Sequence, residues 1–127
     1  MATVTAQLND YRQSPRKVRV VADAVRGKSA TEAKNILGIV IKRASHPLGK
    51  LIDSAIANAK SIGIATENLV VDSIEVNSGK ILYRRMPVAH GSSNPIRKRT
   101  SHVKIVLSER APKVQKSKTK TKTKTKN

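Results

Sequence analysis

The sequence contains no cysteine, phenylalanine or tryptophan, and its only aromatic residues are two tyrosines. The absence of cysteine excludes disulfide bonds, thiolate-bound metals and a cysteine nucleophile. Because aromatic side chains are so scarce, the core must be aliphatic, built from Val, Ile, Leu and Ala, and we expect it to be small. The chain has 127 residues, which is the length of one domain.

Acidic residues are scarce as well. Eight Asp and Glu stand against 26 Lys and Arg, which gives a formal net charge of +18. An excess of this size bears on partners rather than on fold, and it indicates a polyanion. A nucleic acid is the commonest polyanion, because each phosphate that a basic side chain neutralises releases a condensed counterion.

Long apolar runs are missing too. None approaches the roughly 20 residues needed to span a bilayer, so we expect no membrane association. The N-terminal segment Met1–Thr5 lacks the charged start and the apolar middle of a signal peptide. These features predict a cytoplasmic protein, and the unextended N-terminus favours a bacterial protein over an imported organellar one.

Three segments in the first half of the chain carry helical patterns. Ser14-Pro15 joins an N-cap residue to a proline at the first helical position, and Gly27 follows as a C-terminal cap. A second helix begins at Ser29, with Glu32 completing a capping box, and a third ends near Gly63. Apolar residues recur at helical spacing in each segment: Val18, Val21, Ala22 and Val25; Ala33, Ile36, Leu37 and Val40; Leu48, Leu51, Ile52, Ala55, Ile56 and Ala59.

Strand-like patterns flank these helices. Residues 4–8 alternate between apolar and polar, and two further strands are predicted over 69–76 and 102–107. We therefore predict an α+β fold in which three helices pack on one face of a small three-stranded antiparallel sheet. One globular domain would span residues 1–111.

A long basic segment joins the last two predicted strands. No acidic residue lies between Glu75 and Glu109. The connection 77–101 far exceeds the usual hairpin loop of about 2–5 residues and is too polar to form a core. We predict an extended β-hairpin with its tip near His90-Gly91, reaching about 40 Å from the sheet at roughly 3.3 Å per residue. Such an arm requires a polyanion around it.

The C-terminal segment has a different character. From residue 112 onward the sequence is of low complexity and ends in alternating Lys and Thr. Neither face of that alternation is apolar and like charges repel, so we predict a disordered tail over residues 112–127. The tail would add affinity for a nucleic acid without adding sequence preference.

Four motifs stand in a fixed order along the chain. They are Ser14–Asp23 with Arg26-Gly27, Ser54–Ala59, Met86-Pro87 with Gly91, and Arg97–His102. In order and spacing they resemble the family of ribosomal protein twenty-two of the large subunit, in its bacterial type, and the register runs from about residue 6 to residue 110. The resemblance implies a structural, non-catalytic constituent of the large ribosomal subunit that binds its RNA and assists its assembly. In that family the hairpin runs through RNA and its tip lines the nascent-peptide exit tunnel.

The resemblance also implies roles for individual residues. Contacts with ribosomal RNA fall on the first predicted helix and on the hairpin, at Arg16, Lys17, Arg19, Arg84, Arg85, Arg97, Lys98, Arg99 and His102. The tunnel-facing tip would comprise Met86, Pro87, Val88, Ala89, His90, Gly91, Ser92, Ser93 and Asn94. Family tips commonly carry Arg or Lys at several of these positions, so this tip is less charged than the pattern. The implied partners are large-subunit ribosomal RNA, other large-subunit proteins and the nascent peptide, with no homo-oligomer and no cofactor.

Each basic cluster also has a purely structural interpretation. The cations of the first predicted helix fit the solvated face of an amphipathic helix, and Arg97–Arg99 fits charge that protects an edge strand from aggregation. Asn58 is expected to bond within the body, and Asp23 to hold Arg19 and Arg26.

Two other function classes compete with the ribosomal interpretation. A nonspecific DNA- or RNA-compacting protein would share the charge and the tail, and Met86-Pro87 could serve as an apolar wedge at a ribbon tip. Basic residues on both the helix and the arm favour an RNA envelope over a duplex groove. An enzyme lacks support, because the sequence has no phosphate-binding loop or triad order, and His46, His90 and His102 lack metal-ligand spacing.

Overall fold

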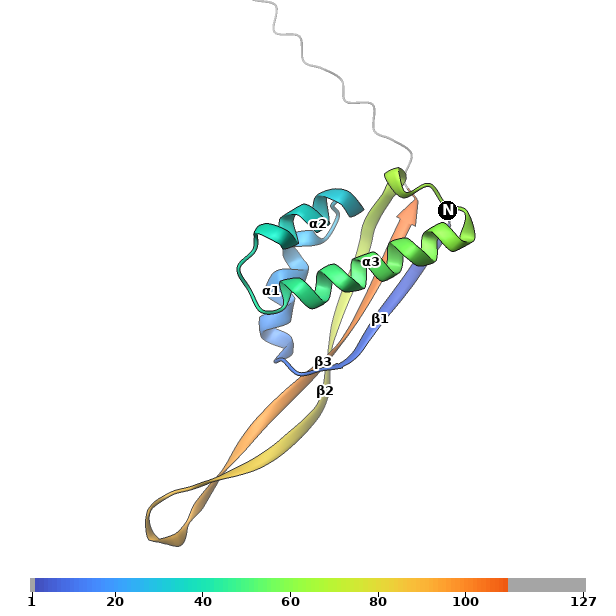
Figure 1. Ribbon diagram of the computed structural model, residues 1–127. Helices are drawn as coiled ribbons and strands as arrows, with labels where there is room; N and C mark the ends of the chain where they lie inside the picture. The colour runs from blue at the N-terminus through green and yellow to red at the C-terminus, as the bar shows by residue number, and fades with distance from the viewer. Residues whose placement is uncertain (1, 110–127) are drawn as a thin grey trace, which may run out of the picture.

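Three helices lie over one face of a three-stranded sheet, and two of the strands continue beyond the body as a twisted ribbon (Figure 1). The computed structural model describes residues 2–109, so the predicted tail at 112–127 lies outside the described residues. The elements are β1 (Thr3–Tyr11), α1 (Pro15–Val25), α2 (Ala30–Ile39), α3 (Ser45–Ile62), β2 (Leu69–Pro87) and β3 (Ser93–Glu109). The predicted α+β class is confirmed.

The sheet has the order β1-β3-β2, and both strand pairs are antiparallel. The strand that comes last in the described chain is therefore the central one. Thr3 pairs with Ser108 on one side of β3, and Val71 pairs with Leu107 on the other. Burial alternates along β1 and along the inner halves of β2 and β3, so that one face of the sheet meets the helices.

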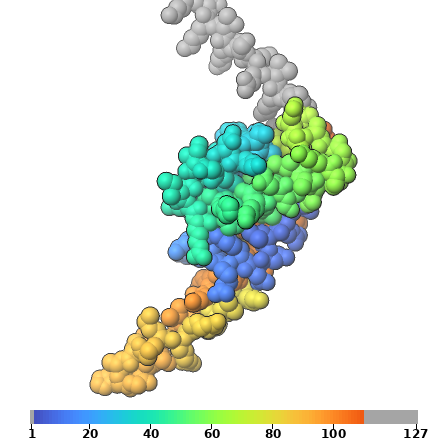
Figure 2. All heavy atoms as spheres, viewed as in Figure 1, coloured from blue at the N-terminus to red at the C-terminus, as the bar shows by residue number. Residues whose placement is uncertain are grey.

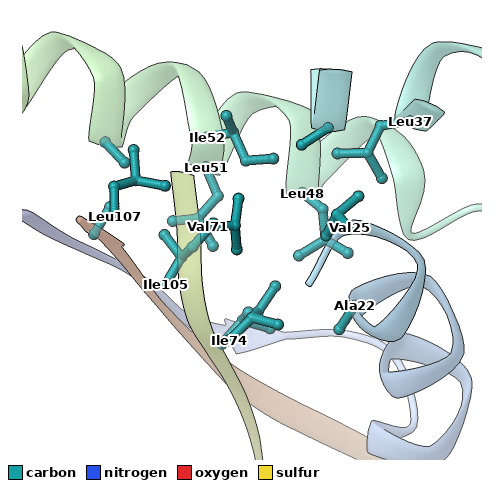
Figure 3. Close-up of a cluster of buried hydrophobic side chains, with 14 of the residues drawn as sticks. Ala22, Val25, Leu37, Leu48, Leu51, Ile52, Val71, Ile74, Ile105 and Leu107 are labelled. Atoms are coloured by element: carbon teal, nitrogen blue, oxygen red, sulfur yellow. The ribbon is translucent and has the colours of Figure 1, made fainter. Parts of the chain in front are cut away.

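The core between sheet and helices is aliphatic, as predicted. Ile105 and Leu107 of β3 lie beneath Leu48 and Ile52 of α3, and all four side chains are buried (Figure 3). Val25 of α1 joins the same cluster. Small residues on α3 are buried beside them, which lets the helix lie close to the sheet.

Most of the predicted helix boundaries are confirmed. The side chain of Ser29 accepts a hydrogen bond from the backbone N–H of Glu32 at 3.2 Å, and Gly63 ends α3 in the left-handed region with φ of 85°. Two details differ. Glu32 does not complete a capping box but pairs with Lys28 at 3.3 Å. Val40 lies outside the buried stripe of α2, because the helix stops at Ile39 and Val40 is its half-buried C-cap.

The arm is the part of the β2–β3 ribbon beyond the body, and it projects as a narrow extension (Figure 2). The predicted extended hairpin with its tip near His90-Gly91 is confirmed, because the ladder continues to the pair Pro87–Ser93. The strands themselves therefore run much further than the predicted segments 69–76 and 102–107. The predicted connection 77–101 also includes Thr100 and Ser101, which are 1% and 0% exposed at the base of the arm. A β-bulge lies there, where Gly79 and Lys80 stand opposite Thr100.

Candidate nucleic-acid interface

A basic hollow lies where the arm leaves the body. It has a volume of about 930 Å³, and four segments surround it: the β1–α1 loop, the α1 helix that follows it, the α2–α3 loop and β3. Its lining residues are Arg12, Gln13, Ser14, Lys17, Arg43, Arg97, Lys98 and Arg99. The fold therefore brings the predicted Lys17 together with the predicted Arg97–Arg99, although they lie on separate elements.

A second, smaller hollow of about 420 Å³ adjoins the first along α1. Its lining residues are Ser14, Pro15, Arg16, Lys17, Arg19, Ser78 and Arg99, so it shares Ser14, Lys17 and Arg99 with the basic hollow. Together the two form one continuous cationic surface from the start of α1 to the base of the arm.

Two cations of the basic hollow, Arg12 and Arg43, were not among the predicted site residues. Arg12 follows the end of β1, and Arg43 stands in the loop between α2 and α3. The only signal in the sequence is that both are basic residues in short loops. Such a signal has no periodicity and does not distinguish them from other surface cations.

No carboxylate lines either hollow. Within residues 2–109 the ion pairs are Arg26–Asp23, Lys28–Glu32, Lys34–Asp53 and Lys80–Asp10. The six cations of the basic hollow therefore have no acidic partner within the described part of the chain. Like charges gathered in a concave surface create a positive potential that attracts an anion.

Arg19, one of the predicted RNA contacts, bonds to the sheet. Its Nε and Nη2 both donate to the carbonyl oxygen of Val76, at 3.2 and 3.0 Å. Arg26 also bonds to β2, two residues before Val76: its Nη2 donates to the carbonyl of Ile74 at 3.2 Å. The two arginines thus occupy acceptors on the free edge of β2, just before the arm begins. Asp23 pairs with Arg26 at 3.3 Å, whereas the expected pair with Arg19 is not among the ion pairs of residues 2–109.

Nearer the start of β2, the turn after α1 covers the edge of the strand. The N–H of Gly27 donates to the carbonyl of Val71, and the N–H of Val71 donates to the carbonyl of Lys28, both at 2.9 Å. Gly27 has φ of 73°, a left-handed conformation that Gly adopts readily. On the opposite edge of the sheet, Asn58 Nδ2 donates to the carbonyl of Thr5 at 3.2 Å, which confirms the expected bond within the body.

His102 lies at the base of the arm and is half-buried. Its Nδ1 accepts a hydrogen bond from the backbone N–H of Asp10 at 3.2 Å, where β1 has a register shift and Asp10 adopts φ of 53°. One ring nitrogen is therefore already engaged within the protein. Like Arg19, His102 is a predicted RNA contact whose side chain already makes a hydrogen bond to the protein's own backbone.

The arm presents two faces, because residues directly opposite each other in the ladder share a face. One face, here called the Tyr83 face, carries the pairs Ile81–Arg99, Tyr83–Arg97 and Arg85–Pro95. The other, here called the Leu82 face, carries Leu82–Lys98, Arg84–Ile96 and Met86–Asn94. Arg84 and Arg85 are both exposed. Cations therefore project from both sides of the ribbon.

The predicted tip, residues 86–94, is exposed throughout. It closes through a short 3-10 turn, η2 (Ala89–Gly91), in which His90 has φ of 58°. The N–H of Val88 donates to the carbonyl of Ser92 at 2.9 Å across this turn. Met86 is 54% exposed and Val88 is 40% exposed, so the tip presents apolar side chains beside its polar ones.

No group of three or more His, Cys, Asp or Glu residues within residues 2–109 could hold a metal ion. Within the same residues, no helix has the length and apolarity required to cross a membrane.

Comparison with known proteins gives a consistent result. The family model described as ribosomal protein L22p/L17e matches residues 6–108. The large ribosomal subunit protein uL22 of Syntrophotalea carbinolica is 45% identical over 106 residues, covering 83% of this chain and 96% of the relative. The protein of the same name from Latilactobacillus sakei is 44% identical over 111 residues (87% and 95%), and that from Fusobacterium nucleatum is 48% identical over 99 residues (77% and 89%). The chain therefore belongs to the ribosomal protein L22p/L17e family.

Proposed function

We propose that this ribosomal protein is a structural constituent of the large ribosomal subunit, in the cytoplasm of a bacterium, and that it binds large-subunit ribosomal RNA. Its relatives are named as large ribosomal subunit proteins, which supports its assignment to that subunit. The observation that carries RNA binding is the basic hollow, where six cations from four segments have no carboxylate beside them. Phosphate groups would supply the missing negative charge, and the counterions released would favour binding.

The distribution of charge favours folded RNA over a DNA duplex. Cations lie around the hollow, along α1 and on both faces of the arm, so several directions are engaged at once. A duplex groove would contact one ribbon face or one helix, whereas a folded RNA can surround the arm. Arginine suits such contacts, because its planar fork grips phosphate at two points and stacks on unpaired bases.

The mechanism we propose is electrostatic and geometric, with no catalytic step. The hollow and the arm neutralise phosphates of several RNA segments and so hold those segments in one arrangement during assembly. The arm has little buried apolar surface of its own, so RNA contacts would offset the entropy of ordering it. Slow, protected amide exchange from Tyr83 to Arg97 in the free protein would contradict this coupling.

The tip would line the nascent-peptide exit tunnel, as the family resemblance implies. Its exposed Met86 and Val88 would offer apolar contacts to a passing peptide. Because the tip has no Lys or Arg between residues 87 and 94, its influence on a charged peptide would be weak. Other large-subunit proteins would be its remaining protein partners.

Reconstitution of the large subunit tests the RNA-binding proposal. We expect the double change Arg97→Glu and Arg99→Glu to reduce incorporation while the body stays folded, since both side chains are exposed. Lys50→Glu with Lys60→Glu is the matched control: it alters net charge equally, at exposed positions that line neither hollow. Equal incorporation of the two double variants would count against the role of the hollow.

Crosslinking in cells tests the partner directly. Sequencing of the attached nucleic acid should recover large-subunit ribosomal RNA, with contacts near the exit tunnel. Crosslinks spread over DNA or unrelated RNAs would instead support a compacting protein.

A further inference from the structure

The two tyrosines of the chain occupy very different environments. Tyr11 is half-buried in the body, and its hydroxyl donates to Gln13 Oε1 at 2.8 Å and to the carbonyl of Arg43 at 3.3 Å. Tyr83 lies on the arm with 58% of its surface exposed, and its hydroxyl makes no hydrogen bond within residues 2–109. Tyr83 is the only Phe, Tyr or Trp residue of the arm, and its ring is uncovered and available to a partner.

Cations surround this ring on its own face of the ribbon. Arg97 stands directly opposite Tyr83 in the ladder, and Arg85 and Arg99 lie one pair further toward the tip and toward the body. Opposite residues on one face have Cβ atoms about 4.5–5.5 Å apart, and diagonal ones about 7–8 Å, within reach of long side chains. Arg85 Nη1 donates to Ser93 Oγ at 3.3 Å, which leaves its other nitrogens available.

We propose that Tyr83 is a stacking platform for one unpaired base of the RNA, with Arg97 and Arg99 contacting the phosphates on either side of that base. This inference rests on the proposed function, since it names the form of RNA that the Tyr83 face takes. An exposed aromatic ring among cations suits single-stranded RNA, because unpaired bases can turn outward and stack while basic side chains follow the backbone. Paired bases in an RNA helix are covered by their neighbours and do not offer a face to the ring.

A purely structural role would leave the Tyr83 side chain less exposed than it is. If the ring served only to stabilise the ribbon, it would lie against its neighbours, as the half-buried Leu82 and Ile96 do on the Leu82 face. Tyr83 is instead more exposed than either of these. The exposure of Tyr83 therefore fits contact with a partner better than packing within the ribbon.

Binding of short RNAs to the full chain tests the inference. The probes are an unpaired oligoribonucleotide and an RNA duplex, each measured against Tyr83→Phe and Tyr83→Ile. Ile keeps β-propensity and apolar bulk but lacks a π face. We expect Tyr83→Ile to weaken binding of the unpaired RNA by about 5- to 150-fold, the range for one stacked base, and Tyr83→Phe to have little effect. Duplex binding should be the same for all three proteins.

Fluorescence provides a second readout, because the sequence contains no tryptophan. The tryptophan fluorescence of the Tyr83→Trp variant should be quenched when the unpaired RNA binds. The fluorescence of Leu82→Trp, at the adjacent position on the other face, should stay unchanged. Equal affinity of wild type and Tyr83→Ile for unpaired RNA, or an equal loss on the duplex, would overturn the stacking site while leaving RNA binding intact. Failure of the wild-type chain to bind either RNA would overturn the proposed function as well.

Discussion

The base of the arm allows a sharp test of how the fold positions it. Gly79 and Lys80 stand opposite Thr100 in the bulge, and Thr100 Oγ1 donates to the carbonyl of Lys80 at 2.6 Å. A Cβ at position 79 would overlap Thr100 Oγ1 and would lie 3.0 Å from His102 Nε2. Because Thr100 is only 1% exposed, its side chain has little room to move away. Gly79 is therefore required for close approach of the two strands.

The expected magnitude follows from these contacts. Gly79→Ala would displace the Thr100 hydroxyl, losing a hydrogen bond that contributes about 0.5–1.5 kcal/mol. Overpacking of the bulge adds about 1–3 kcal/mol. The smaller conformational entropy of Ala in the unfolded chain offsets about 0.4–1 kcal/mol of this destabilisation. We expect a net destabilisation of about 0.5–4 kcal/mol.

Urea unfolding followed by circular dichroism measures this value, and a double-mutant cycle isolates its cause. Thr100→Ala removes the oxygen that a Cβ at position 79 would meet, so Gly79→Ala should destabilise that background less, by at least about 0.5 kcal/mol. Gly38→Ala is the matched control, because a Cβ there meets nothing within 4 Å and the site lies inside α2. It should stabilise the protein by about 0.5–1 kcal/mol. Equal effects of Gly79→Ala in both backgrounds would refute the proposed contact.

Three further predictions concern the core, the edge of β2 and the hollow. Leu48→Ala should lower the free energy of unfolding by about 2–5 kcal/mol in the same urea assay, because this side chain is 2% exposed at the centre of the core. Arg19→Lys keeps the charge but loses the paired bond to Val76, so amide exchange at the base of the arm should accelerate while the salt dependence of RNA binding stays unchanged. Arg12→Gln and Arg43→Gln should each reduce the slope of log K against log salt by about 0.7–0.9; an unchanged slope would remove that residue from the interface.

The sequence was most informative where local chemistry decides structure. Ser29 and Gly63 mark the ends of helices through a side-chain bond and a left-handed backbone, both of which depend on the residue itself. The paired arm was predicted from the length, charge and polarity of the connection rather than from periodicity, because its exposed two-stranded ribbon shows no regular alternation of apolar and polar residues. Val40 fits the helical period but falls one residue beyond the end of α2.

The candidate site was predicted only in part, and the reason is tertiary. Arg97–Arg99 and Lys17 belong to recognisable motifs, whereas Arg12 and Arg43 come into the hollow only because the β1–α1 and α2–α3 loops meet beside β3. Arg16 and Arg19 look alike in sequence, one turn apart on the same helix. The position of the β2 edge gives Arg19 a carbonyl partner at Val76, a distinction that no local pattern contains.

The central position of β3 has a consequence for biogenesis. During synthesis β1 and β2 are made first, yet both pair chiefly with β3, which follows them in the chain. Until β3 is complete, the growing chain carries two strands with unfilled hydrogen-bonding edges and a helix layer without its sheet. Contacts such as Thr3 with Ser108 join distant parts of the chain and close slowly. We therefore expect the nascent protein to be prone to aggregation until β3 is made and paired. Rapid binding to a polyanion would shorten that interval.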